Sequence, residues 1–304
     1  MSTSSNILIV GSVAFDDVET PAGRRERSLG GSANYFAMGA SHFGPVQLVA
    51  VVGADFPESH IKRLESRGVD LEGLEQVEGD TFFWRGRYGA DFGDAETLDT
   101  HLNVFADFQP KIPSAYQSSP YLFLGNIHPS LQEDVVDQVK GPKLIGCDTM
   151  NFWIHGEPEA LSKLLKKINL LIINEGEARL LSGEKNLIKS VELIRAMGPE
   201  IIIIKKGAHG AAIFHPEGRF FIPAYPLSEL QDPTGAGDSF ASGVMGHIAR
   251  EDKTDLKTFK TALIYGTVMA SFACEGFSFD RVAALTMDEI EARADEIKAL
   301  ISLD

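Results

Sequence analysis

One short stretch of the chain places a carboxylate beside small residues in an order suited to phosphoryl transfer. Residues 232–240 read Asp-Pro-Thr-Gly-Ala-Gly-Asp-Ser-Phe and precede a helical pattern that runs to Arg250. Small residues at 235–237 let the backbone approach a ligand, and amides at a helix N-terminus can hold the negative charge that grows on a transferring phosphoryl group. Asp238, in the first turn, can accept a proton from an incoming hydroxyl. The alternative is a glycine-rich turn with an acid favoured by the helix dipole.

A second carboxylate, Asp16, follows the apolar run Ile7 to Val10, which predicts a strand. Open α/β sheets bind ligands in the crevice outside the carboxyl ends of their strands. A carboxylate there can accept hydrogen bonds from two vicinal hydroxyls, and a site built in this way rejects analogues that lack them. The alternative for Asp16 is a turn-capping role beside Asp17.

Asn174 and Glu177 follow another apolar run, Leu170 to Ile173. An Asn followed three residues later by Glu is a helix capping box, which needs no further function. The same pair can hold the water shell of Mg²⁺, because this ion keeps several waters and reaches the protein through few direct ligands. The two roles are compatible.

Together these stretches resemble the ribokinase-like (PfkB) family of carbohydrate and nucleoside kinases, and the resemblance extends over most of the chain. It implies that Asp238 is the catalytic base and that Gly235, Ala236 and Gly237 form the anion hole. It also implies ATP as co-substrate and Mg²⁺ as cofactor, with Glu177 holding Mg²⁺ through water.

The resemblance assigns further residues to the two substrates and to a second ion. The acceptor-binding residues are Asp16, Gly30 and Gly31, and the nucleotide-binding residues are Asn174, Lys205, Gly207, Gly210 and Thr234. Asp232 and Thr234 also fall where some members of the family bind a monovalent cation, so K⁺ is a further candidate ion. For Lys205 alone, a solvated surface lysine is an equal alternative.

The chain departs from the family at one position of its first motif. Gly30 and Gly31 precede a helical pattern over 38–43, and a gapless alignment places the family's usual asparagine on Tyr35, while Asn34 lies one residue earlier. Either the helix starts in a shifted register or the contact with the substrate is aromatic. Both residues are therefore candidates for acceptor binding.

The elements that must position these residues alternate along the chain. Apolar runs predict strands over 7–10, 47–52, 121–124, 144–147, 170–173 and 201–204, and helical patterns lie between them over 57–67, 131–139, 157–167 and 187–197. This alternation predicts parallel βαβ units, hence a doubly wound, mostly parallel α/β fold flanked by helices. After residue 204 the pattern predicts a hairpin over 211–214 and 219–222, then helices over 239–250, 256–272 and 288–300.

Two segments interrupt this rhythm, at approximately 12–30 and 80–110, and both contain short alternating pieces. We interpret them as strands of a small β lid inserted into a single kinase domain that spans residues 1–304; a pair of surface loops is the alternative. The second segment is rich in aromatic residues, namely Phe82, Phe83, Trp84, Tyr88, Phe92 and Phe105. These could stack on a nucleobase, and packing of the lid is the other explanation.

Composition excludes several classes of protein. The formal net charge is -15, with 28 Lys and Arg against 43 Asp and Glu, and this argues against a nucleic-acid partner. Two cysteines support neither a disulfide framework nor a Cys-based zinc site. No run approaches the roughly 18 apolar residues of a membrane span, and the N-terminus lacks the pattern of a signal peptide. We therefore expect a cytoplasmic protein without a membrane partner.

The sequence thus predicts an ATP-dependent kinase whose acceptor is a hydroxyl, primary by family norm, of a sugar or sugar derivative. A nucleoside kinase of the same family is the alternative within the class. A non-catalytic sugar or nucleotide sensor is the alternative from another class, although a sensor does not need a positioned base. By family expectation the lid would form a homodimer.

Overall fold

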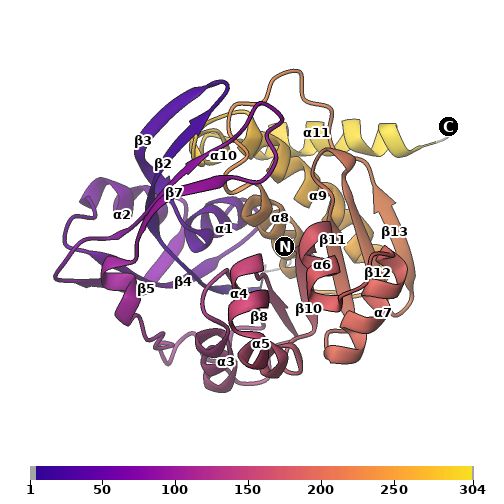
Figure 1. Cartoon of the computed structure of the whole chain (residues 1–304), viewed down its shortest axis with the longest axis horizontal. Coiled ribbons are helices and arrows are strands. Elements are labelled where there is room, and N and C mark those ends of the chain that lie inside the picture. Colours follow the sequence, from indigo (N-terminus) through magenta and orange to yellow (C-terminus); the bar gives the residue numbers. More distant parts are fainter. Residues whose placement is uncertain (1–4, 303–304) are drawn as a thin grey trace.

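The computed structural model describes residues 5–302, and its centre is a nine-stranded sheet (Figure 1). Its strands, in spatial order, are β13 (Gly218–Ile222), β12 (Ala211–His215), β11 (Ile201–Lys205), β10 (Leu170–Asn174), β9 (Leu144–Cys147), β8 (Tyr121–Leu124), β1 (Ile7–Val10), β4 (Val46–Gly53) and β5 (Val69–Val77). From β11 to β5 every neighbouring pair is parallel, whereas β11, β12 and β13 pair antiparallel. The predicted fold class is confirmed.

Helices cover both faces of this sheet because its strands are apolar on both sides. In β1, Ile7 and Ile9 face one core, and Leu8 and Val10 face the other. The helices of the first core are α1 (Ser32–Ala40), α2 (Glu58–Glu65), α8 (Ala236–Glu251), α9 (Leu256–Cys274), α10 (Asp280–Ala283) and α11 (Met287–Ile301). Those of the second are α3 (Pro129–Gln138), α4 (Asn151–Gly156), α5 (Pro158–Leu165), α6 (Glu175–Ser182) and α7 (Leu187–Met197).

The first helix lies elsewhere than predicted. We expected helical residues over 38–43, but α1 begins at Ser32, directly after Gly31, and ends at Ala40, so Phe43 lies beyond it. All of its residues are buried, because α1 packs against both α8 and β4. A helix that is buried all round has no polar face, so its period cannot be read from the sequence.

A second sheet is built by the two interrupting segments. It has the order β3 (Gly23–Gly30), β2 (Ala14–Thr20), β6 (Phe82–Arg87) and β7 (Glu96–His101), and it is followed by a 3-10 helix over Asn103–Asp107. β2 and β3 form one antiparallel hairpin, β6 and β7 form another, and β2 joins β6 in parallel. We call these four strands the small sheet. Figure 1 shows them at one end of the molecule, in indigo and purple, beside α1 and α2.

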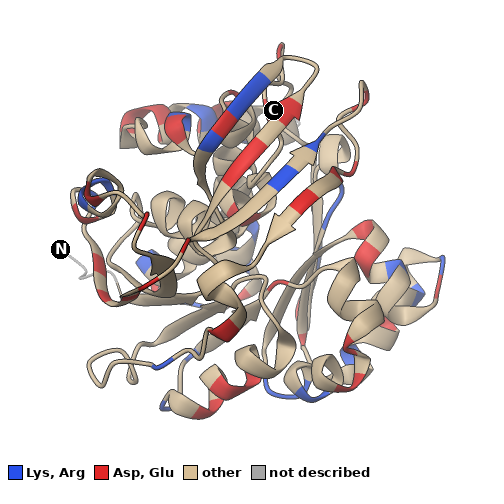
Figure 2. Ribbon diagram, turned by 60° about the vertical axis from the view of Figure 1, so that its left-hand side comes forward, with Lys and Arg blue, Asp and Glu red and all other residues tan. Residues whose placement is uncertain are grey.

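Charged residues of both signs are interspersed over the small sheet and the outer helices in the view of Figure 2. Within residues 5–302, no helix is long and apolar enough to cross a membrane.

Candidate active site

The N-terminus of α8 carries Asp238 in its first turn, where the sequence pattern predicted it. Gly235 caps this helix with a φ of 72°, a left-handed conformation that glycine adopts without strain, and a side chain there would overlap the ring of Tyr35. The first amides of a helix lack intrahelical acceptors. Here the Ala236 amide donates to the Pro233 carbonyl at 3.1 Å, which leaves the Gly237 amide to face an anion.

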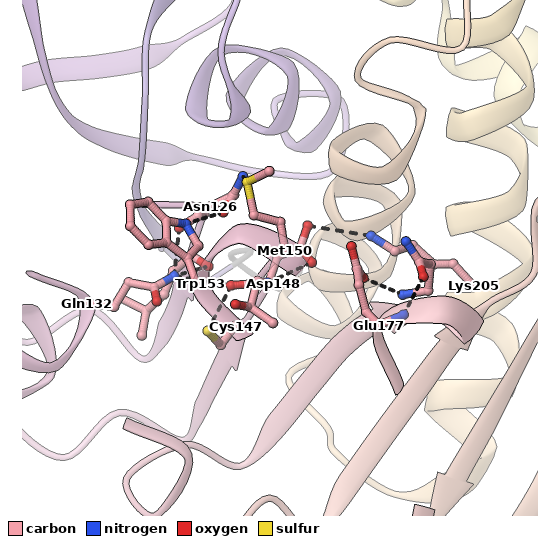
Figure 3. Close-up of polar contacts among 12 residues, drawn as sticks. Asn126, Gln132, Cys147, Asp148, Met150, Trp153, Glu177 and Lys205 are labelled. Atoms are coloured by element: carbon pink, nitrogen blue, oxygen red, sulfur yellow. Dashed lines mark hydrogen bonds and ion pairs between the residues drawn. The ribbon is translucent and has the colours of Figure 1, made fainter. Parts of the chain in front are cut away.

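Lys205, the last residue of β11, lies beside this helix terminus rather than at the surface. Its ammonium is 3.0 Å from the position that a Cβ on Gly237 would occupy, and its Nζ lies 3.4 Å from Oδ2 of Asp148 (Figure 3). Burial alone would lower the pKa of Lys205, but the charges of Asp148, Glu177 and Asp238 outweigh it and raise that pKa. The ammonium therefore stays charged next to the N-terminus of α8.

Asp238 itself has the electrostatics of a base that works near neutral pH. Burial of the carboxylate and the neighbouring charge of Asp148 raise the pKa of Asp238 to about 7, while Lys205 opposes the shift. A general base is most effective when its pKa lies near the working pH.

Asn174 and Glu177 form the predicted capping box at the start of α6. The Glu177 amide donates to Oδ1 of Asn174 at 2.8 Å, and the Asn174 amide donates to Oε2 of Glu177 at 2.7 Å. The second carboxylate oxygen, Oε1, accepts no hydrogen bond from the described residues. Burial is the main cause that raises the pKa of Glu177 to about 7, and the charge of Asp148 adds to it.

The carboxylates of Glu177 and Asp148 fit Mg²⁺, which prefers oxygen ligands. Glu177 and Asp148 bring two buried carboxylates to the carboxyl ends of β10 and β9, and both have a raised pKa that a nearby cation would relieve. Within residues 5–302 no group of three or more His, Cys, Asp or Glu side chains forms a metal cage. Mg²⁺ needs no such cage, because one or two carboxylates, waters and substrate phosphates complete its shell.

Asp16, on β2 of the small sheet, lies close enough to Asp238 for their charges to interact. It is 5% exposed, and no described residue donates a hydrogen bond to its carboxylate. Burial, and then the charges of Asp232, Asp238 and Asp17, raise the pKa of Asp16 to about 8. Gly30 passes so close to this carboxylate that a side chain there would overlap it. The carboxylate is thus enclosed, and its lone pairs remain available to a ligand.

The two candidates from the first motif both carry a buried polar atom without a hydrogen-bond partner in the described chain. Asn34 is fully buried; its amide nitrogen donates back to the Gly30 carbonyl at 3.0 Å, and its Oδ1 is unpartnered. Tyr35 packs edge-on against Phe279, and its hydroxyl is buried without a hydrogen-bond partner in the described chain. Burial raises the pKa of Tyr35 well above its ordinary value, and the charges of Asp16 and Asp232 add to the shift. The hydroxyl is therefore a neutral donor next to Asp16.

Asp232 is fully buried in the loop before α8, where its carboxylate accepts hydrogen bonds from two backbone amides. Oδ1 accepts from the Thr234 amide at 2.8 Å, and Oδ2 accepts from the Ser278 amide at 3.5 Å. Burial raises the pKa of Asp232. The Thr234 hydroxyl donates to the Tyr88 hydroxyl at 3.2 Å, so the loop before α8 is joined directly to the end of β6 in the small sheet.

Gly207 and Gly210 lie farther along the same edge, in a turn between β11 and β12 that contains a short 3-10 helix over Gly207–His209. The Lys206 amide donates to the Gly210 carbonyl and closes the turn. The turn follows Lys205, the last residue of β11, and so lies at the carboxyl end of that strand. Asn174, Lys205, Gly207 and Gly210 thus all lie at the carboxyl ends of β10 and β11.

The aromatic residues of the small sheet mostly pack on one another. Phe82 stacks on Phe105 with 5.3 Å between ring centroids, and Phe83 lies 5.9 Å from the ring of His101. Trp84 covers Gly86 and donates to the Thr97 hydroxyl. Tyr88, by its bond to Thr234, is the member of this group that reaches the site. Packing of the small sheet is therefore the better explanation for most of these aromatics.

Sequence reasoning missed Asp148 and the site contact of Tyr88. Asp148 directly follows the apolar run Leu144 to Cys147, the kind of position that singled out Asp16, so the signal was present. The contact between Tyr88 and Thr234 joins segments that are remote in sequence, and no local pattern announces it.

A sequence model of the pfkB family carbohydrate kinases matches residues 5–279. The cytidine kinase of Thermococcus kodakarensis is 26% identical over 254 residues, which cover 81% of this chain and 89% of that protein. Two solved structures share the fold. A nucleoside kinase of Burkholderia thailandensis in complex with inosine has a TM-score of 0.77 at 20% identity, covering 96% of this chain and 99% of that one. A ribokinase-like protein of E. coli in complex with ATP and Mg²⁺ has a TM-score of 0.79 at 21% identity, with the same coverage.

The parallel sheet with its small second sheet, the glycine-rich turn before α8 and the family match over most of the chain agree with one another. The chain belongs to the pfkB family of carbohydrate kinases, and it is an ATP-dependent kinase of a carbohydrate or nucleoside.

Proposed function

We propose that the protein transfers the γ-phosphoryl group of ATP to a hydroxyl of a neutral nucleoside. The observation that carries this proposal is the enclosed carboxylate of Asp16, to which no described residue donates a hydrogen bond. Two vicinal hydroxyls of a ribose supply the donors that it lacks. The Tyr35 hydroxyl, likewise without a partner, supplies a further contact.

Charge around the acceptor site favours a neutral acceptor over an anionic one. The charged groups that act on Asp16 are the carboxylates of Asp232, Asp238 and Asp17, and each raises its pKa. A sugar acid or a sugar phosphate would add another negative charge to this enclosed cluster. We therefore set aside anionic sugar derivatives as acceptors. The names of relatives, a cytidine kinase and a nucleoside kinase with inosine, favour a nucleoside over a free sugar.

In the reaction, Asp238 takes the proton of the acceptor hydroxyl as its oxygen attacks the γ-phosphorus. The bond between that phosphorus and the β,γ-bridging oxygen breaks, and ADP leaves with both electrons of the bond. The Gly237 amide and the Lys205 ammonium hold the charge that spreads over the transferring group. Mg²⁺, held through Glu177 and Asp148, supplies neutralisation of phosphate charge when it is bound.

The small sheet acts in this proposal as a lid that keeps water from competing with the acceptor. It carries Asp16 and Tyr88, and the hydrogen bond from Thr234 to Tyr88 fastens it to the loop before α8. Closure of the lid therefore brings the acceptor and the anion hole together.

The acceptor panel is the direct test. We expect ADP release with Mg-ATP and nucleosides at a kcat/KM at least about tenfold above that with free pentoses or hexoses, and no release with sugar acids or sugar phosphates. Turnover confined to an anionic acceptor would overturn the proposal. Tight binding of nucleosides and ATP without any turnover would instead identify a sensor.

Removing the Tyr88 hydroxyl, which accepts the hydrogen bond from Thr234, should loosen the lid. In Tyr88→Phe we expect the KM for the acceptor to rise about fivefold, because one hydrogen bond is worth about 1 kcal/mol. The ratio of ATP hydrolysed to acceptor phosphorylated should rise as well, since water enters more often. Parallel assays of phosphate release and of phosphorylated product measure both quantities.

The matched control for this change is Tyr225→Phe, which removes a hydroxyl bonded to Glu296 at the surface. It should leave both quantities unchanged. Equal behaviour of the two variants would show that the bond between Tyr88 and Thr234 does not hold the lid.

A further inference from the structure

Two exposed apolar side chains stand together at the edge of the site, after the end of β9. Met150 is 39% exposed and Phe152 is 64% exposed, and they follow Asp148 closely in the chain. Phe152 lies in the first turn of α4 and packs edge-on against Trp153, with 4.8 Å between ring centroids. Large apolar groups in water cost free energy, so a contiguous set beside a site indicates a ligand surface.

This surface is held in place by a polar side chain from the neighbouring strand end. Asn126, after β8, accepts a hydrogen bond from Nε1 of Trp153 at 2.9 Å, and its amide nitrogen lies 3.0 Å from the sulfur of Met150 (Figure 3). Gln132 bridges the two loops by donating to the carbonyls of Gly125 at 2.8 Å and Asp148 at 3.1 Å. We call Asn126, Met150, Phe152 and Trp153 the aromatic platform.

The aromatic platform lies between the acceptor loop and the phosphate side of the site. Gly125, next to Asn126, lies so close to Ser32 that a Cβ there would be 2.8 Å from the Ser32 hydroxyl. Ser32 begins α1 directly after Gly30 and Gly31. On the other side, Asp148 reaches Lys205. We expect a molecule whose hydroxyls meet Asp16 to extend its remaining part toward the platform.

We infer that the aromatic platform binds the nucleobase of the acceptor, an inference that rests on the proposed nucleoside kinase function. Bases stack on aromatic side chains, and Phe152 offers an exposed ring for this. The Asn126 amide donates one N–H to the Met150 thioether, which is a weak acceptor. The other N–H can therefore donate to a polar edge of a base. The aromatics of the small sheet are committed to mutual packing and leave this task to the platform.

Truncating the exposed ring tests the inference. In Phe152→Ala we expect the KM for the nucleoside to rise about 5- to 100-fold, the range for loss of a stacked base. The KM for ATP and the kcat at saturating nucleoside should stay within about twofold. Phe221→Ala is the matched control, because this Phe is 54% exposed on β13, the edge strand of the nine-stranded sheet. It should leave all three quantities unchanged.

A second readout does not depend on turnover. The chain has two tryptophans, so in Trp84→Phe the fluorescence of Trp153 can be followed alone. Nucleosides should quench or shift this emission at concentrations near their KM, whereas free ribose should not. Adding Phe152→Ala should raise the concentration of nucleoside required by the same factor as the KM.

The outcomes separate this inference from the function on which it rests. If wild type phosphorylates no nucleoside, the proposed function fails. If wild type phosphorylates nucleosides, but Phe152→Ala keeps a wild-type KM and Trp153 emission does not respond to nucleosides, the proposed function stands. Base binding by the aromatic platform is then refuted. A rise in the KM for ATP equal to that for the nucleoside would likewise refute it.

Discussion

Asp238→Asn should lower kcat by about 10² to 10⁴ while the KM values for ATP and acceptor change by less than about threefold. The amide has nearly the shape of the carboxylate, so the first turn of α8 and the contact between Gly235 and Tyr35 should persist. It cannot accept the proton, however, and the loss falls on the chemical step. Single-turnover rates with saturating nucleoside and Mg-ATP measure this step directly.

The matched control is Asp288→Asn, an exposed acid in the first turn of α11. Both substitutions remove an acid from the first turn of a helix, and in Asp288→Asn this should cost about 0.5 kcal/mol of stability. The raised pKa of Asp238 offsets this loss, so Asp238→Asn should be no less stable than wild type near neutral pH. They should differ in kcat, which Asp288→Asn leaves unchanged. Near-normal turnover in Asp238→Asn would show that Asp238 is an ordinary helix-capping acid and not the base.

Asp16→Asn should abolish measurable use of the acceptor and at the same time stabilise the ligand-free protein. The pKa of Asp16 is raised from 3.8 to about 8, mainly by burial. Between about pH 4 and pH 8 the folded chain therefore keeps a proton that the unfolded chain has released, so the Asp16 contribution to stability falls as the pH rises through this window. Asparagine has no proton to lose, so we expect the free energy of unfolding of Asp16→Asn to exceed that of wild type by an amount on the order of 3 kcal/mol at pH 8.

Urea unfolding of wild type and Asp16→Asn at pH 5 and pH 8 tests whether the substitution raises the free energy of unfolding. The difference in the free energy of unfolding should be small at pH 5 and large at pH 8. Asp17→Asn is the neighbouring control: its carboxylate is paired with Arg85 at 3.1 Å, so this variant should be no more stable than wild type at either pH. A loss of stability at pH 8 in Asp16→Asn would contradict the assignment of Asp16 as a buried, unpartnered carboxylate.

The sequence predicted those helices and strands whose apolar residues form a continuous, one-sided or alternating pattern. It missed the elements that lack such a pattern. Strands such as Ile7–Val10 and Tyr121–Leu124 were predicted at their observed bounds, because every residue in them is apolar. β5, over Val69–Val77, was not predicted, since it lies at the sheet edge and carries exposed acids. An edge strand is exposed to solvent along its unpaired edge, so its amino-acid composition resembles that of a loop.

Residues of the candidate site were predictable where a local motif marks them and not where the fold alone joins them. Asp238 and Gly235 stand in one continuous stretch, whose chemistry can be read directly. The pairing of Lys205 with Asp148 joins the ends of two different strands, and the sequence left Lys205 undecided between phosphate and solvent. Asn34 and Tyr35 both lie in α1, whose start the sequence placed too late.

The site is divided between two sets of elements, and this division has a consequence for evolution. Glu177, Lys205 and Asp238, which we assign to the phosphoryl group, come from α6, β11 and α8. Asp16 and the aromatic platform, which we assign to the acceptor, come from the small sheet and the loops after β8 and β9. Substitutions can therefore accumulate in the second set without disturbing the first. A lineage built on this plan is free to exchange one acceptor for another while inheriting its chemistry intact.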